Sequence, residues 1–232
     1  MRSMRASLLL GTSLCAAPAV AGPDWIEGGR MGGPDAGSTL ASAQPILAGT
    51  EEIVTIVGRL DAGFGGNAAG IADFEDMYLL QILSPSTFSF HITAAGFDAQ
   101  LWLFNVTLPG EAFGLLANND TPFSMNPLLT RPATDLTGAD VLFPGVYAIA
   151  VSGAGRIPVS ANGPIFSFAS PTEISGADGI GGLRPHIDWT GMGQTGDYQI
   201  EMTGVGRFDV PAPSAAILLL GGTGLLSARR RR

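Results

Sequence analysis

Residues 88–93 read Phe-Ser-Phe-His-Ile-Thr, an alternation of apolar and polar side chains. Successive side chains of a β-strand point to opposite faces, so this stretch predicts a strand with one buried face. The same pattern recurs at Tyr198, Ile200 and Met202, and a more apolar version runs from Tyr78 to Leu83. These three segments indicate a domain built from strands.

The rest of the central chain also favours strands. Shorter apolar runs lie at residues 101–104, 141–143, 146–151 and 165–168. The 33 Gly and 16 Pro interrupt the chain too often for long helices. We therefore expect an all-β fold over residues 49–206, in the form of an antiparallel two-sheet sandwich. Residues 22–48 are rich in Gly and Pro without apolar periodicity, which predicts a linker or a loosely attached edge segment.

The N-terminus carries the pattern of an export signal. Arg2 and Arg5 precede an apolar run over residues 6–17, and Ala19 and Ala21 form an A-x-A cleavage site. This arrangement predicts a secretory signal peptide over residues 1–21, helical in its apolar part and recognised by signal peptidase. Cleavage after Ala21 would remove the single Cys of the chain and leave the exported protein without a thiol or a disulfide.

Residues 207–232 predict a sorting or anchor tail. An apolar run over residues 215–228 predicts a short C-terminal helix. As a helix it would span about 21 Å, less than the roughly 30 Å of a bilayer core. By the positive-inside rule the basic end would stay cytoplasmic and stop transfer, leaving the domain outside. The run follows a Pro-rich motif, Val210, Pro211, Ala212, Pro213 and Ser214, and precedes the basic end, Arg229, Arg230, Arg231 and Arg232.

Residues 210–232 resemble the PEP-CTERM sorting signal of bacterial exported proteins. Ala212 stands where that family usually has Glu. The resemblance implies an exosortase-like processing enzyme as a partner, and a protein of the cell surface or the exopolysaccharide matrix that is at least transiently held in the membrane. The alternative is a plain C-terminal membrane anchor that is not processed.

Residues 50–206 resemble the bacterial pre-peptidase C-terminal type of domain, a jelly-roll-like β-sandwich. That family implies a non-catalytic role in secretion, surface attachment or polymer binding, with calcium bound in some members. The connection 153–195 is longer than usual for the family, and we expect a surface excursion with residues 165–168 as an extra strand. The matching stretches, taken in order, are residues 73–78, 97–104, 118–120, 142–147 and 196–200.

Charge excludes one class of partner and permits another. The chain has no Lys, and outside residues 1–21 and 211–232 six Arg stand against all 20 Asp and Glu. Nucleic-acid binding needs clustered basic residues, so we expect none. Oxygen-bearing side chains in predicted loops could hold Ca²⁺, or they could begin turns by bonding their own backbone. The candidate ligands are Asp73, Asp76, Asp98, Asn118 and Asp120.

Motifs for catalysis are weak in this sequence. Residues 191–196 match G-x-G-x-x-G, but an alternating strand pattern follows, so we predict a loop instead of a dinucleotide site. We expect His91 and His186 to be solvated, and Trp189, in a Gly-rich loop, to contact a polysaccharide or to pack. The prediction is a non-enzymatic structural or adhesive protein. The alternatives are a polysaccharide hydrolase using Asp73 and Asp76, or a calcium-stabilised accessory module.

Overall fold

The computed structural model describes residues 25–28, 35–46, 52–61, 72–107 and 110–207, and the part of the chain that it describes is all-β. No helix among these residues is long and apolar enough to cross a membrane. The predicted signal helix and the predicted C-terminal helix lie outside the described residues. The all-β prediction is therefore confirmed for the central region.

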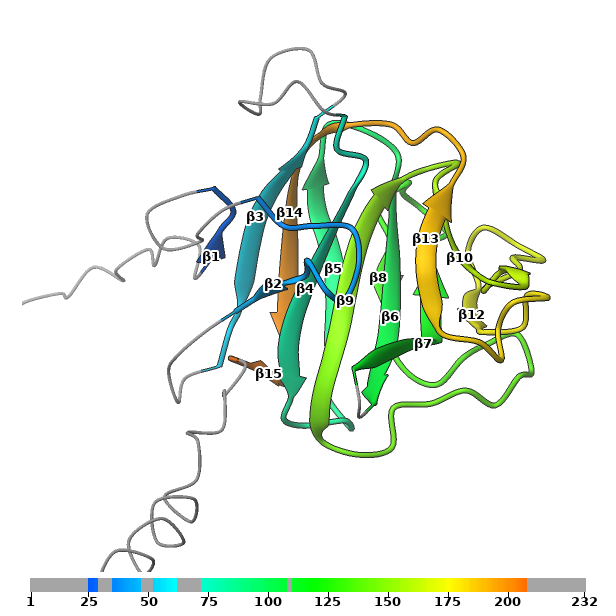
Figure 1. Cartoon of the computed structure of the whole chain (residues 1–232). Coiled ribbons are helices and arrows are strands. Elements are labelled where there is room, and N and C mark those ends of the chain that lie inside the picture. The colour runs from blue at the N-terminus through cyan, green and yellow to red at the C-terminus, as the bar shows by residue number, and fades with distance from the viewer. Residues whose placement is uncertain (1–24, 29–34, 47–51, 62–71, 108–109, 208–232) are drawn as a thin grey trace, which may run out of the picture.

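Two large sheets form the body of the protein (Figure 1). The five-stranded sheet has the order β1 (Trp25–Ile26), β3 (Thr55–Leu60), β14 (Gly196–Thr203), β5 (Ser89–Ala95) and β8 (Leu128–Leu129). The seven-stranded sheet runs through β12 (Ile174–Gly176), β7 (Glu111–Asn118), β6 (Ala99–Thr107), β9 (Gly145–Gly153) and β4 (Glu75–Ile82), with β15 (Val205–Gly206) and β2 (Gln44–Pro45) both paired to β4.

The pairing is antiparallel except at two short edge strands. β1 runs parallel to β3, and β2 runs parallel to β4. The sheets are thus mixed, where the sequence predicted purely antiparallel ones. Alternation could not reveal this difference, because each parallel strand has only two residues.

The main core lies between the two large sheets. In the five-stranded sheet Ile200 of β14 stands opposite Ile56 of β3 and Ile92 of β5, and all three are fully buried. Side chains from the seven-stranded sheet, such as Leu101 and Ile149, belong to the same apolar cluster. The alternating segments found in the sequence therefore supply the inward faces of both sheets.

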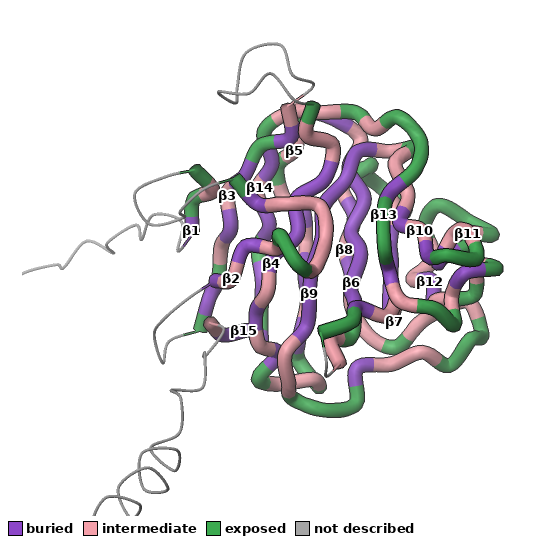
Figure 2. The backbone as a smooth tube through the Cα atoms, in the orientation of Figure 1, coloured by how far each residue is buried: buried purple, intermediate pink, exposed green. Residues whose placement is uncertain are grey.

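The seven-stranded sheet is also covered on its outer face, as the buried stretches of β6 and β9 in Figure 2 indicate. Side chains on this face, including Trp102, Phe104 and Ala150, form a second buried cluster. Residues 153–195 contribute Ile165, Phe166 and Trp189 to the cluster and also form a three-stranded sheet. The predicted surface excursion is thus a third layer. Its strands are β11 (Gly163–Pro164), β10 (Ile157–Ser160) and β13 (His186–Thr190).

Two apolar runs that predicted strands are irregular. At 141–143, Val141 is buried but Leu142 and Phe143 are exposed, and β9 begins only after Pro144. At 165–168 the chain has no strand, and its apolar side chains fill the second cluster. A short apolar run does not specify backbone pairing, which explains the error at 165–168, and at 141–143 it does not even specify burial.

The described part of the predicted linker 22–48 belongs to the domain. Trp25 and Ile46 lie in the main core, and the Trp25 indole donates to the Gln44 side chain at 2.7 Å. The backbone of Met77 donates to Gly37 at 3.1 Å, which fixes residues 36–46 beside β4. Of the two alternatives for this segment, the described residues match an edge segment and not a linker, because β1 pairs with β3 and β2 pairs with β4.

Candidate functional site

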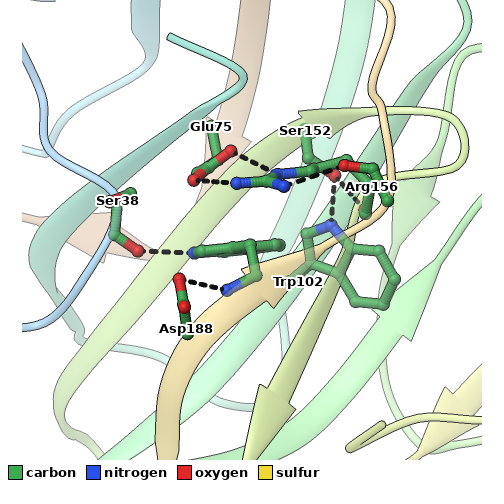
Figure 3. A network of polar contacts seen from close by, with 8 residues as sticks. Ser38, Glu75, Trp102, Ser152, Arg156 and Asp188 are labelled. Carbon is green, nitrogen blue, oxygen red and sulfur yellow. Dashed lines mark hydrogen bonds and ion pairs between the residues drawn. The ribbon is translucent and has the colours of Figure 1, made fainter. Parts of the chain in front are cut away.

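Trp189, the predicted polysaccharide contact, is buried in β13 with only 4% of its surface exposed. Its ring lies edge-on to Trp102, with centroids 6.1 Å apart, and its Nε1 donates to the carbonyl of Ser38 at 2.5 Å. Figure 3 shows the Trp102 side of this network, where Trp102 Nε1 donates to Ser152 Oγ at 2.8 Å. The surface prediction for Trp189 is therefore wrong: the residue joins the third layer to the segment around Ser38.

His186 is likewise buried, against the prediction of a solvated ring. It packs between Phe104 and Trp189, with centroid distances of 5.2 and 5.1 Å. Neither ring nitrogen has a hydrogen-bond partner within the described residues. Burial lowers the pKa of His186 to about 4, so the ring is neutral at physiological pH. This apolar setting makes it a packing residue.

Residues 191–196 lead straight into β14, and no helix follows. A dinucleotide fingerprint requires a helix whose N-terminus faces the pyrophosphate. The prediction of a loop that leads into a strand is thus confirmed.

The structure separates the five predicted calcium ligands into two groups and a structural residue. Asp73 lies just before β4, and Asp76 lies within it. Asp98 and Asp120 form the second group: burial raises the pKa of Asp98, and the nearby charge of Asp120 raises it further. The Asn118 side chain is fully engaged elsewhere: its amide donates to the Glu173 carbonyl, and its oxygen accepts from the Leu128 backbone, both at 2.9 Å. Asn118 therefore holds loops together and is not available as a ligand in this arrangement.

Asp73 lines an open acidic pocket of about 420 Å³ beside the edge of β3. Asp61 and Asp73 are held opposite one another by two backbone hydrogen bonds of 2.9 and 2.6 Å. Arg59 also lines the pocket, and its guanidinium reaches the exposed Asp197 at 3.1 Å. The other acidic residues of the lining are Glu27 and Asp35.

Glu27 is positioned by backbone donors on both sides of the pocket. Its Oε1 accepts from the Ala36 amide at 2.7 Å, and its Oε2 accepts from the Arg59 amide at 2.9 Å. Gly58 provides the space, because a Cβ there would lie 2.7 Å from Glu27 Oε2 and 2.3 Å from the hydroxyl of Tyr198. The segment of β1 is thereby attached to β3 through a carboxylate as well as through the strand pairing.

Asp76 is fully buried below this pocket. Its Oδ2 accepts from the Tyr198 hydroxyl at 2.6 Å, and that hydroxyl lies 2.6 Å from the hydroxyl of Tyr78. Its Oδ1 has no hydrogen-bond partner within the described residues. One oxygen of each of Glu27, Asp35 and Asp76 falls within a group whose members all lie within 4.8 Å of one another.

The carboxylates of this site disfavour one another's ionisation. Burial raises the pKa of Asp76 well above its ordinary value, and the negative charge of Glu27 adds to the effect. Burial, followed by the charges of Asp35 and Glu27, raises the pKa of Asp73 to about 8. Burial also raises the pKa of Glu27. A carboxyl group of this kind can retain a proton near neutral pH, or it can release the proton to a bound cation.

Sequence reasoning found Asp73 and Asp76 but missed Glu27, Asp35 and Tyr198. Glu27 and Asp35 lie in the segment read as a linker, and Tyr198 was assigned only to a strand face. A weak signal was present in the sequence, because Glu27 and Asp35 are acidic residues within an otherwise Gly- and Pro-rich stretch. Only the pairing of that stretch with β3 and β4 brings them to Asp76.

The other predicted site residues, Ala19, Ala21, Val210 to Ser214 and Arg229 to Arg232, lie outside the described residues. No protein-family model matches the chain, and neither the curated proteins nor the solved structures contain a significant match.

Proposed function

We propose that the protein is an exported, surface-sorted and non-enzymatic β-sandwich, jelly-roll-like in form, with a structural or adhesive role in the cell envelope or the exopolysaccharide matrix. The observation that carries the proposal is the combination of the two ends: the leader with its Ala19–Ala21 cleavage site, and the tail of Pro-rich motif, apolar run and four Arg. The all-β domain between them supports it, because both faces of its large sheet are buried by its own chain.

A shallow hollow of about 500 Å³ offers a place for an extended polymer. Thr93, Asn126 and Gln199 line it, on or beside the five-stranded sheet. Hydroxyl and amide groups of this kind exchange hydrogen bonds readily with sugar hydroxyls. The hollow takes the role that the sequence assigned to Trp189, whose burial removes it from the surface.

Intact mass and fractionation of the protein from its own cells test the proposal. We expect a mass that lacks residues 1–21 and the Arg-rich end, recovered from the surface or the matrix. An intact tail in the membrane fraction would refute sorting by an exosortase-like enzyme and leave a plain anchor. Retention of the leader in the cytosol would refute export.

The acidic pocket favours one second function, a polysaccharide hydrolase with Asp73 as general acid. A carboxyl group with a pKa of about 8 is protonated at neutral pH, and ionised neighbours are the usual companions of such an acid. The described lining of the pocket contains no aromatic platform for a sugar ring. Release of reducing ends from the producing cell's polysaccharide, lost in Asp73→Asn, would favour the hydrolase over the structural role.

A further inference from the structure

Three acidic side chains from separate parts of the chain meet at one point. Glu27 follows β1, Asp35 precedes the segment that pairs with β4, and Asp76 belongs to β4 itself. Their oxygens lie within 4.8 Å of one another, which is closer than ionised carboxylates remain without a counter-charge. Asp73 lines the same pocket and adds a fourth acidic group.

A second observation is that a buried carboxylate oxygen at this point lacks a donor among the described residues. Asp76 is fully buried, and its Oδ1 has no hydrogen-bond partner among the described residues. Asp73 also has a buried oxygen, Oδ2, without a partner there. Buried carboxylate oxygens are normally satisfied, and leaving one unsatisfied costs about 1–3 kcal/mol or more. Either a shared proton or a bound cation must therefore lie between Asp76 and Glu27.

We propose that Glu27, Asp35 and Asp76, assisted by Asp73, form a calcium site that fastens the N-terminal segment to strand β4. The site differs from the sequence-based set, since it excludes Asn118 and the Asp98–Asp120 pair. The proposal stands apart from export and sorting, because it depends only on the described residues.

The donor set specifies the kind of ion. All the ligands are carboxylate oxygens, which suit hard cations, and the group contains no His or Cys to favour zinc or copper. Oxygens within 4.8 Å of one another are close enough to share one Ca²⁺, whose oxygen ligands lie at about 2.4 Å. A divalent ion would also offset the negative charge of these acids. Arg59 is the only cationic residue in the described lining of the pocket, and it pairs with Asp197.

The consequence for the fold is a bridge between the two large sheets. Glu27 belongs to the segment paired with β3 of the five-stranded sheet, while Asp76 belongs to β4 of the seven-stranded sheet. An ion between them links both sheets to residues 35–37, which have few apolar contacts of their own beyond the buried Ala36. Loss of the ion should therefore loosen this edge before it affects the main core.

The test uses the protein isolated from its own cells, freed of metal with a chelator and kept in about 0.15 M NaCl to screen nonspecific attraction. Calorimetric titration with CaCl₂ and thermal unfolding with and without about 1 mM Ca²⁺ are measured. We expect saturable binding of one ion and a rise in Tm of about 5 °C or more. Neither heat nor a shift in Tm would overturn the proposal, and an equal response to Mg²⁺ would overturn the assignment to calcium.

Three variants locate the site. Asp76→Asn keeps an acceptor for the Tyr198 hydroxyl while removing the charge, and it should abolish the calcium-dependent shift. Asp35→Asn changes an exposed carboxylate, so it leaves the core intact if Asp76→Asn fails to fold, and it should weaken binding tenfold or more. The matched control is Asp197→Asn, which lines the same pocket but pairs with Arg59. Equal losses in Asp35→Asn and Asp197→Asn would overturn the assigned ligands.

Discussion

Replacement of Trp189 by Ala tests whether this residue is an internal anchor or a ligand contact. The side chain is 96% buried, lies against Trp102 and His186, and donates to the Ser38 carbonyl at 2.5 Å. Truncation of a buried aromatic residue to Ala costs about 3–5 kcal/mol, because the protein loses the free energy of burying the apolar ring and gains a cavity in its place. We therefore expect the free energy of unfolding to fall by about that amount, and Tm to fall by about 6–20 °C.

A second variant separates the contribution of the packed ring from that of the hydrogen bond to Ser38. Trp189→Phe keeps most of the ring but removes the donor to Ser38, so it should cost about 1–2 kcal/mol. Phe123→Ala is the matched control, since Phe123 is 99% exposed and should change stability by no more than about 0.5 kcal/mol.

Equilibrium urea unfolding followed by far-ultraviolet circular dichroism measures all three variants, because fluorescence would change with the Trp itself. A loss of less than about 1 kcal/mol in Trp189→Ala, equal to that of Phe123→Ala, would refute the buried position and restore Trp189 as a surface contact.

Two further predictions concern buried charge. Between pH 6.5 and 4 the unfolded chain binds a proton at His186, but the folded protein, in which the pKa is about 4, does not. The free energy of unfolding therefore decreases as the pH is lowered through this range. Compared with His186→Phe, wild type should lose about 2–3 kcal/mol more between pH 7 and pH 4.5 in urea unfolding, and identical pH profiles would contradict this. Arg156→Met leaves Glu75, 5% exposed, without its ion pair at 2.9 Å and should cost about 3–5 kcal/mol, with partial recovery in the double variant carrying Glu75→Gln. A double-mutant cycle with no coupling would show that the pair contributes nothing.

The spacing of residues along the chain predicted only part of the acidic site. Asp73 and Asp76 are oxygen-bearing residues where a strand is expected to begin, and the structure places Asp73 before β4 and Asp76 within it. Glu27 and Asp35 lie in a segment without apolar alternation, so its pattern gives no sign that they join this site. They reach Asp76 through backbone pairing with β3 and β4, which local periodicity in the segment does not predict.

The sequence by itself determined the all-β class and the inward faces of strands β4, β5 and β14, because the two-residue period of a strand is written directly into its side chains. It also predicted the loop that leads into β14. The tertiary structure alone decided that residues 153–195 cover the outer face of the large sheet, burying Trp189, and that Glu27 and Asp35 meet Asp76. Periodicity records which side chains must leave water, but what covers them, and which distant acids become neighbours, depends on how the layers pack.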